Sequence, residues 1–451
     1  MNYLNLLYKL YQYKKNTKRS REDILKRQAE KLRDILEYSY HHSTYYQRVF
    51  ETVGITKENI RQIPISSFPS LDKATFVQYF DEIVTDVVLH QNDLQVFDED
   101  IALTQMTYKG KYHVVHSSGS TGKPTYYVYD EHAWNEMLIG ILRAALWDMS
   151  MPEILKLLLS GPRIVYIAAT DGRYGGAMAV GAGIEGIHAK QLFLDINLPV
   201  KQWMKEVEEF QPNIIIGYPS AIKILAELIE KKEIQIRVKR VISCGEPLNS
   251  SLRDYLEKVF NAPLMNIYGA SESLAIGVEA SSKEGMYLFD DMNYVEIENG
   301  NMYLTSLYNF AQPLIRYKIS DRLMIKETNE NRYPLTLIEN ILGRNEDMMW
   351  FEDENGEKDF LHPLAIEGFV FEGMLDFQFH QIDKQTFEML IQMNNQSQNN
   401  NVKDYMQKQM NKILDLKNLS YVQFVVQIVD EIYPDRKTGK KRLITKERIY
   451  E

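Results

Sequence analysis

The chain has 451 residues, of which 45% are hydrophobic and 25% charged, and its formal net charge is −10. This is the balance of a globular protein, and the length predicts two or three domains. The acidic balance excludes a general nucleic-acid surface, and the single cysteine, Cys244, excludes intramolecular disulfides and multi-cysteine zinc sites. No uninterrupted run of about 18 apolar residues occurs, so we expect a cytoplasmic enzyme without membrane insertion.

The first part of the chain is predicted to be helical, because apolar residues recur at helical spacing over residues 21–50. From about residue 110, short apolar runs alternate with helical stretches. The expected strands are 163–170, 213–218, 241–244 and 265–270, and the expected helices are 221–232 and 252–260. This alternation predicts α/β sheets that bind ligands at the strand ends. The glycine-rich segment 171–183 fits either a close backbone approach to a ligand or a tightly packed small-residue helix.

After residue 290 the pattern changes to short strands and turns, beginning with a strand at 302–307. Further along we expect a hairpin loop at 354–360, a polar loop at 392–401, a helix at 402–414 and a strand at 420–430. The predicted fold class is therefore α/β, with a large multi-sheet N-terminal domain and a small mobile α+β C-terminal domain. The expected ranges are 1–342, divided into a helical segment 1–105 and a binding core 106–342, and 343–451.

The segment HSSGSTGKPT, residues 116–125, combines glycines, hydroxyls and Lys123. Such a loop can turn backbone N–H groups and a positive charge toward a polyphosphate. A P-loop needs four residues between its glycines and a hydroxyl after the lysine. Here two residues separate Gly119 from Gly122, and Pro124 follows the lysine. The segment therefore predicts a phosphate site outside the P-loop class, with a flexible surface turn as the alternative.

Five further motifs carry candidate chemistry. They are SCGEPLN (243–249), NIYGASES (266–273), RYKISD (316–321), GRNED (343–347) and PDRKTGKKR (434–442). Tyr268 offers a ring face, Ser271 a hydroxyl donor and Glu272 a hard oxygen ligand suited to Mg²⁺. Taken singly, Glu272 and Asp321 also fit capping or turn carboxylates, and Lys440 fits a solvated basic run.

In this order, the motifs resemble the adenylate-forming superfamily of acyl-CoA synthetases, peptide-synthetase adenylation domains and luciferases. They are most similar to the phenylacetate–coenzyme A ligase family and its capsule-biosynthesis relatives, over nearly the whole chain. Ser271 replaces the threonine of the family's strand-end motif, and Ile319 and Ser320 depart from its pattern before Asp321. Glu346 stands at the hinge position where the family has Asp or Lys. The segment 350–368 is longer than the family's tight turn, which weakens the transfer of the coenzyme A assignment.

The resemblance implies activation of a carboxylic acid by ATP and Mg²⁺ to an acyl-adenylate, with release of pyrophosphate. Transfer to a thiol follows, either of coenzyme A or of a carrier-protein phosphopantetheine. The implied phosphate-binding residues are Ser117, Ser118, Gly119, Ser120, Thr121, Gly122 and Lys123. The implied nucleoside-binding residues are Gly245, Glu246, Pro247, Asn266, Tyr268, Gly269, Asp321 and Arg344.

The resemblance also assigns the catalytic groups. Glu272 would bind Mg²⁺, Ser271 would contact the α-phosphate, and Lys440 would swing in to stabilise charge. Tyr166, Tyr218 and Ala270 would line a pocket for an aryl or medium apolar acid, and Glu346 would act as the hinge.

Three alternatives remain open at this point. One is a non-catalytic nucleotide-binding relative, and another is an adenylating enzyme of polysaccharide or capsule biosynthesis with a non-thiol acceptor. The third, a P-loop kinase, is disfavoured by the glycine spacing. The expected partner is a small carboxylic acid, while an acyl-carrier protein and an oligomeric state are left open.

Overall fold

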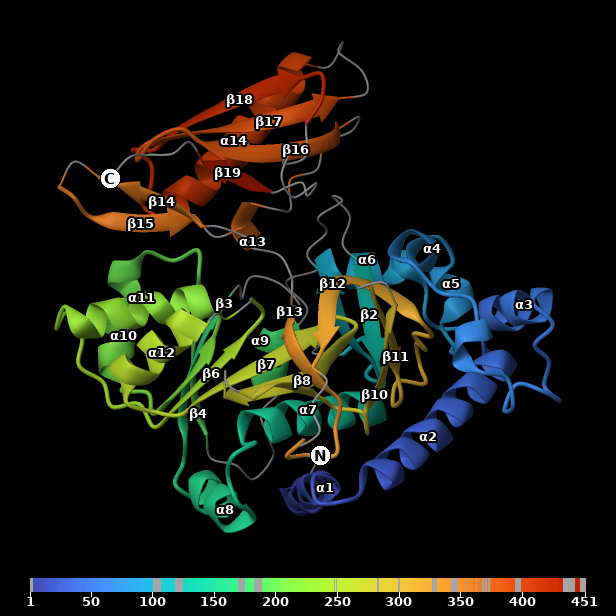
Figure 1. The fold of residues 1–451 in the computed structure, drawn as a ribbon. Coiled ribbons are helices and arrows are strands. Elements are labelled where there is room, and N and C mark those ends of the chain that lie inside the picture. Colours follow the sequence, from blue (N-terminus) through green and yellow to red (C-terminus); the bar gives the residue numbers. More distant parts are fainter. Residues whose placement is uncertain are drawn as a thin grey trace.

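The computed structural model describes most of the chain. The described residues are 3–99, 107–117, 125–168, 175–181, 189–246, 248, 250–281, 284–298, 301–326, 331–341, 348–353, 355–361, 363–366, 369, 371, 374–393, 399–432 and 443–446. Figure 1 shows a large part, built on a long mixed sheet, beneath a smaller C-terminal sheet. We call the described residues from 349 to 446 the C-terminal unit. The predicted α/β class is confirmed, whereas the predicted boundary between residues 342 and 343 lies outside the described residues.

Helices make up the N-terminal segment, as predicted. They are α1 (Tyr3–Asn16), α2 (Arg21–His42), α3 (Thr44–Thr52), the short 3-10 turn η1 (Ile65–Ser67), α4 (Lys73–Gln78), α5 (Phe80–Ile83) and α6 (Gln91–Glu99). The single helix expected over 21–50 is divided at Ser43. The Ser43 hydroxyl accepts the N–H of Tyr46 and starts α3, while the Ser43 N–H still donates to Ser39 at the end of α2. One residue therefore caps both helices.

The described part of the large sheet contains eleven strands in the order β10-β11-β12-β13-β9-β8-β7-β6-β5-β3-β4. Their bounds are β3 (Arg163–Ala168), β4 (Lys190–Asp195), β5 (Ile214–Gly217), β6 (Arg240–Cys244), β7 (Leu264–Ala270), β8 (Ser273–Ser281), β9 (Gly285–Leu288), β10 (Asn293–Glu298), β11 (Asn301–Ser306), β12 (Tyr317–Ile325) and β13 (Leu337–Ile341). Strands β4, β3, β5, β6 and β7 run parallel, and β8 turns back antiparallel to β7.

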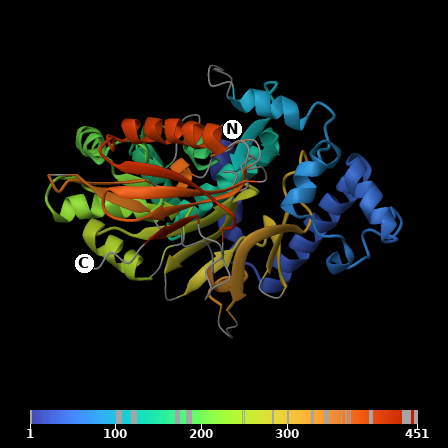
Figure 2. The ribbon, with the colours of Figure 1, turned by 90° about the horizontal axis from the view of Figure 1, so that it is seen from above.

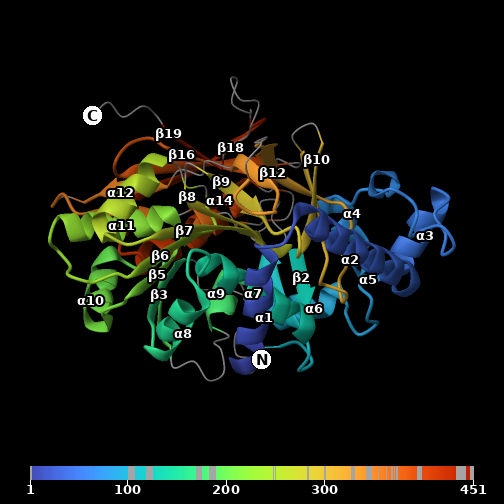
Figure 3. The same cartoon turned by 60° about the horizontal axis from the view of Figure 1, so that its bottom comes forward.

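Helices cover both faces of the parallel strands. Helix α7 (Glu131–Ala145) packs on β7 and β8, and it lies beside α1 on the side that Figure 3 brings forward. Helices α10 (Val200–Phe210), α11 (Pro219–Glu230) and α12 (Ser250–Phe260) share the second hydrophobic core, and α8 (Met151–Leu159) and α9 (Gly175–Gly181) complete this part. Ile214 and Ile242 belong to the first core, and their neighbours Ile215 and Val241 to the second. Burial on both faces explains why these strands read as continuous apolar runs.

The C-terminal unit has its own core. It contains β14 (Met349–Glu352), β15 (Lys358–Leu361), α13 (Pro363–Ile366), β16 (Met374–Gln381), β17 (Thr386–Met393), α14 (Asn399–Leu416), β18 (Gln423–Val429) and β19 (Ile444–Lys446). The described strands β18-β17-β16-β19 form one sheet, and α14 lies along one side of it (Figure 2). The loop expected at 354–360 is shorter, because residues 358–360 belong to β15.

The β14–β15 hairpin has two buried faces. Met349, Phe351 and Leu361 pack in the core of the C-terminal unit. Phe360 packs instead in the second core of the large part, with its ring 5.9 Å from that of Trp203 on α10. Successive side chains of a strand point to opposite faces, so one face of the hairpin packs on the C-terminal unit and the other on the large part. The hairpin therefore lies between the two parts of the chain.

A further hairpin stands beside the large sheet. Its strands are β1 (His113–Ser117) and β2 (Thr125–Tyr129), and Ser117 pairs with Thr125 at the end where residues 118–124 connect them. This pairing closes the two ends of the predicted phosphate loop. Among the described helices, none combines the length and apolar content needed to cross a bilayer.

Candidate active site

The predicted site residues gather where the parallel strands end. Tyr218 directly follows β5, Gly245 and Glu246 follow β6, and β7 ends at Ala270. Because β5, β6 and β7 are parallel, their carboxyl ends meet at one edge of the sheet. The structure therefore brings three of the motifs to one edge of the sheet, and the binding of a ligand there stays a prediction.

Gly245 is in close contact with an aromatic ring. Its φ is +82°, and a Cβ atom there would lie 2.5 Å from a ring carbon of Tyr218. Both facts require glycine, so the Tyr218 ring lies directly against the backbone after β6. The Glu246 carboxylate accepts the N–H and the hydroxyl of Ser220, at 3.1 and 3.0 Å, and thus caps the first turn of α11.

Ser271 and Glu272 form the tip of a tight hairpin. Ala270 pairs with Ser273 across it, so the chain reverses over two residues. A Cβ atom at Gly269 would lie 2.3 Å from the carbonyl oxygen of Leu274, which requires glycine here. The hairpin carries the two predicted catalytic groups out beyond the sheet edge.

Glu272 is half-buried and hydrogen-bonded. The Tyr127 hydroxyl donates to Glu272 Oε1 at 2.7 Å, and the hydroxyls of Tyr127 and Tyr317 lie 3.0 Å apart. Burial raises the pKa of Glu272, while the Tyr127 hydrogen bond and the positive charge of Lys73 oppose that rise. The carboxylate is thus held in one orientation by a phenol network.

Tyr268 and Asp321 are joined by a hydrogen bond. The Tyr268 hydroxyl donates to Asp321 Oδ2 at 2.8 Å, which connects the end of β7 with β12. Asn266 lies earlier in β7, where its amide donates to Glu279 at 2.9 Å. Glu279 also pairs with Arg253 on α12.

Tyr166 lies in the part of the site predicted to receive the acid. It is buried on β3, and its ring is 5.9 Å from that of Phe193. A Cβ atom at Gly176 would lie 2.3 Å from the Tyr166 hydroxyl. Residues 175–181 are helical, so for the described part of 171–183 the tightly packed helix is the better of the two interpretations. Nearby at the end of β6, burial raises the pKa of the Cys244 thiol to about 12.

Several predicted residues lie outside the described residues. These are Ser118, Gly119, Ser120, Thr121, Gly122, Lys123, Pro247, Arg344, Glu346 and Lys440. Ser117 is described as the last residue of β1.

The arrangement of the described carboxylates suits an Mg²⁺ ion that binds together with a nucleotide. It does not suit a metal ion held by protein side chains alone. Within the described ranges, no group of three or more His, Cys, Asp or Glu side chains could hold a metal ion. Mg²⁺ is commonly bound through one or two carboxylates, substrate phosphates and water. The oriented oxygens of Glu272 suit that arrangement.

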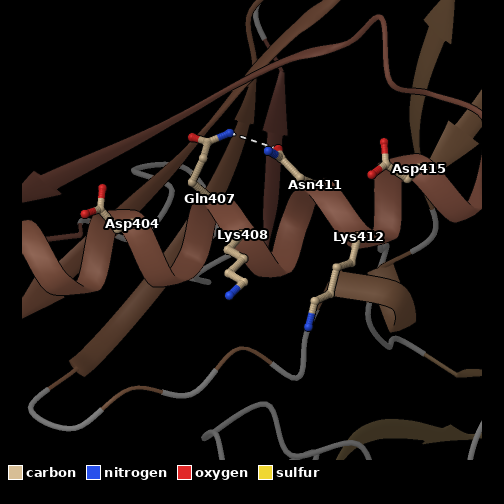
Figure 4. A pocket seen from close by; sticks show the side chains of 6 residues that line it. All are labelled: Asp404, Gln407, Lys408, Asn411, Lys412 and Asp415. Atoms are coloured by element: carbon tan, nitrogen blue, oxygen red, sulfur yellow. Dashed lines mark hydrogen bonds between the residues drawn. The ribbon is translucent and has the colours of Figure 1, made fainter.

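A shallow depression elsewhere has a different character. It runs along α14 in the C-terminal unit (Figure 4). Its lining consists of Asp404, Gln407, Lys408, Asn411, Lys412 and Asp415. Gln407 donates to Asn411 at 3.1 Å, one turn further along. This is the pattern of a solvated polar helix face, and we assign it no role in the site.

The phenol network was missed by the sequence prediction. Tyr127 and Tyr129 lie in TYYVY, immediately after the predicted phosphate loop. Two tyrosines that are two residues apart in a strand project from the same face, and this spacing could have indicated that both point toward the site. Tyr317 lies within the RYKISD motif but was not given a role, and Lys73 had no local signal, because it reaches the site only through tertiary packing.

Known proteins are similar to this chain in sequence. Residues 111–290 match the model of a family described as AMP-binding enzyme. Protein CapK of Staphylococcus aureus is 24% identical, over 95% of this chain and 91% of CapK. The phenylacetate-coenzyme A ligase of Escherichia coli K12 is 25% identical over 71% of each chain. That of Pseudomonas putida is 27% identical over 56% of this chain and 57% of the ligase.

A solved structure shares the fold. It is a 2-hydroxyisobutyryl-CoA ligase in complex with 2-HIB-AMP and CoA in the thioesterification state. The TM-score is 0.63 at 18% identity, over 96% of this chain and 91% of that one. The fold and the matched family together define an adenylate-forming, AMP-binding enzyme. Within this class, the chain is similar in sequence to CapK and to the phenylacetate-coenzyme A ligases.

Proposed function

We propose that the enzyme uses ATP to convert a small carboxylic acid to its acyl-adenylate, releases pyrophosphate, and passes the acyl group to a thiol. The observation that carries this proposal is the meeting at one sheet edge of the Tyr218–Gly245 contact, the Tyr268–Asp321 pair and the oriented Glu272. An aromatic face, a diol acceptor and a hard oxygen ligand are what an adenosine phosphate requires.

The nucleoside would lie between the Gly245 backbone and the ring of Tyr268, with Glu246, Pro247, Asn266 and Gly269 around it. The Oδ2 atom of Asp321 accepts from Tyr268, so we assign Oδ1 to a ribose hydroxyl, together with Arg344.

Charge neutralisation is the main requirement of the first step, because a carboxylate attacks an anionic α-phosphate. Glu272 would hold Mg²⁺, which neutralises phosphate charge when bound. Ser271 would contact the α-phosphate, and the loop from Ser117 to Lys123 would hold the departing pyrophosphate. Its ends are brought together by the Ser117–Thr125 pair.

We further propose that residues 343–451 act as a lid. Lys440 on this lid would enter the site to stabilise charge between the carboxylate and the α-phosphate, and Glu346 would be the hinge. Because Lys440 would contact the reactants only during the reaction, its loss should lower the turnover rate more than the affinity for substrates.

The acid would occupy the region of Tyr166, Tyr218 and Ala270. The buried ring of Tyr166 and the half-buried ring of Phe193 favour an aryl or medium apolar acid. The phenylacetate named for two relatives is an acid of this kind.

The test is pyrophosphate release from ATP with a panel of aryl and aliphatic acids, with and without coenzyme A. We expect release that depends on an acid, and a thioester only when the thiol is present. Phosphate release without acid would support an NTPase, and ATP binding without any release would support a non-catalytic relative. An acyl-adenylate that coenzyme A and carrier-protein thiols fail to consume would favour the alternative, a non-thiol acceptor in capsule or polysaccharide synthesis.

A further inference from the structure

Strand β2 contacts the tip of the β7–β8 hairpin through two phenols. The Tyr127 hydroxyl donates to Glu272 Oε1 at 2.7 Å, and the Tyr129 hydroxyl donates to the carbonyl oxygen of Ser271 at 2.7 Å. Residues two apart on a strand project from the same face. One strand face therefore holds both residues of the hairpin tip.

Tyr127 is itself fixed by its neighbours. The ring of Phe76 on α4 is stacked on it at 5.5 Å with an interplanar angle of 10°. Phe76 also meets Tyr317 edge-on at 5.7 Å, and the Tyr317 hydroxyl is 3.0 Å from that of Tyr127. All three side chains are at most 1% exposed. Turning Tyr127 away would leave a buried hydroxyl unpaired and disrupt the aromatic packing.

The helix that carries Phe76 is tied to β12. The Leu71 N–H donates to Arg316 at 3.1 Å, and the Lys318 N–H donates to Leu71 at 2.8 Å, on either side of Tyr317. The Asp72 side chain then accepts the Thr75 N–H at 2.8 Å and caps α4. The N-terminal helical segment thus contacts Tyr127 through Phe76, and Tyr127 in turn contacts Glu272.

The other edge of β2 is also held in place. The Val128 N–H donates to Gln312 at 2.9 Å, and Asn309 donates to the Val128 carbonyl at 2.9 Å. Strand β2 is therefore anchored at Val128, between the two tyrosines that contact the hairpin tip.

We propose that Tyr127 and Tyr129 are positioning residues, which fix Glu272 and Ser271 relative to strand β2 so that both contact one metal–nucleotide complex. This inference rests on the proposed function. Tyr127 orients the metal ligand through its carboxylate, and Tyr129 orients the α-phosphate contact through the backbone of Ser271.

The two phenols should therefore have separable effects. Loss of a hydrogen-bonding partner of a metal ligand typically weakens metal affinity by about 10–100-fold. We expect Tyr127→Phe to weaken metal binding in the presence of ATP within that range. Tyr129→Phe leaves the carboxylate contact intact, so we expect it to lower turnover while metal affinity changes by less than about 3-fold.

Tyr126 provides a matched control on the same strand. It is 3% exposed, and as the adjacent residue it projects from the opposite face of β2. Tyr126→Phe removes the same atom from an equally buried ring, so a general effect of hydroxyl loss would appear in both variants.

The measurement is calorimetric titration of the full chain with Mn²⁺ at saturating ATP, without acid, together with AMP titration in the absence of metal. Wild type and Tyr126→Phe should bind Mn²⁺ within about 2-fold of each other, and Tyr127→Phe at least about 10-fold more weakly. AMP affinity should be the same in all three, and excess Mg²⁺ should restore pyrophosphate release by Tyr127→Phe.

Two results would overturn these ideas in distinguishable ways. If wild type shows metal-dependent ATP binding and Tyr127→Phe matches Tyr126→Phe, the positioning role is wrong while the proposed function stands. If wild type binds ATP equally with and without metal, the proposed function fails and this inference fails with it. Should Tyr127→Phe not fold, Tyr129→Phe tests the same face of β2, and unchanged turnover in that variant would also contradict the positioning role.

Discussion

Lys417 is buried where the two parts of the chain meet, and its removal should lower the free energy of unfolding. It follows α14, and its Nζ donates to the carbonyl oxygen of Leu198 at 2.6 Å and pairs with Asp359 Oδ1 at 3.0 Å. The ammonium also lies 4.2 Å from the centre of the Phe360 ring, and the side chain is 0% exposed. Burial lowers the pKa of Lys417, and the Asp359 carboxylate opposes that change.

The size of the effect follows from this geometry. Two unit charges at 3.0 Å attract by about 5–6 kcal/mol at an effective dielectric constant of about 20. Desolvation of both ions offsets much of this attraction, but removing one partner leaves the other buried and costs about 3–5 kcal/mol. Asp359→Asn, which leaves the lysine uncompensated, should show that loss. Lys417→Met should lose about 2–3 kcal/mol, because Asp359 keeps its hydrogen bond from the Val200 N–H.

The assay is urea unfolding followed by tryptophan fluorescence, since Trp203 and Trp350 lie beside Phe360. Lys412→Met on the exposed face of α14 is the matched control and should change stability by less than about 0.5 kcal/mol. In a double-mutant cycle, Lys417→Met with Asp359→Asn should cost at least about 2 kcal/mol less than the sum of the single changes. An Asp359→Asn variant within about 1 kcal/mol of wild type would refute the reasoning.

Four further outcomes are expected. Lys440→Ala should reduce pyrophosphate-forming turnover by about 10²-fold or more with little change in ATP affinity, and turnover within a few-fold of wild type would exclude its role. Glu272→Gln should abolish Mg²⁺-dependent adenylation while circular dichroism stays native; an unaltered metal dependence contradicts the assignment. His113, stacked on Trp134 with a pKa that burial lowers to about 4, must stay neutral in the folded state. Stability should therefore fall by up to about 1.4 kcal/mol per pH unit between pH 6.5 and 4, and His113→Gln should flatten that slope in urea titrations. Cys244, with its pKa near 12, should react with iodoacetamide at pH 8 about 10³-fold more slowly than in urea, and equal rates would show that the thiol is not buried.

Local pattern was sufficient to predict the core of the fold. Strands β3, β5, β6 and β7 coincide with expected apolar runs, since burial on both faces leaves a continuous signal. The break at Ser43 was missed because apolar spacing continues through it, and only the capping geometry separates α2 from α3. The start of β15 was hidden by the polar composition of 354–360.

For the candidate site, sequence reasoning found residues but not their partners. The strand ends at Tyr218, Gly245 and Tyr268 could be predicted, because parallel strands bring successive motifs to one edge. The hydrogen bond between Tyr127 and Glu272 joins residues 145 positions apart, and no local pattern specifies such a pairing. The Asn266 amide donates to Glu279, a cross-strand partner that depends on the register of β7 and β8.

The β14–β15 hairpin marks the surface along which the C-terminal unit would separate from the large part, because its two faces pack in different cores. In the lid rotation that we propose, the hairpin cannot remain packed against both cores. Met349, Phe351 and Leu361 pack in the core of the C-terminal unit, whereas Phe360 packs against Trp203 and Asp359 accepts the Val200 N–H of the large part. Separation should therefore occur along α10, where Lys417 would release Leu198 and keep Asp359. Lys417 and Asp359 would then move together as an ion pair. The lid rotation would therefore avoid the free-energy cost of leaving an unpaired charge in an apolar surface.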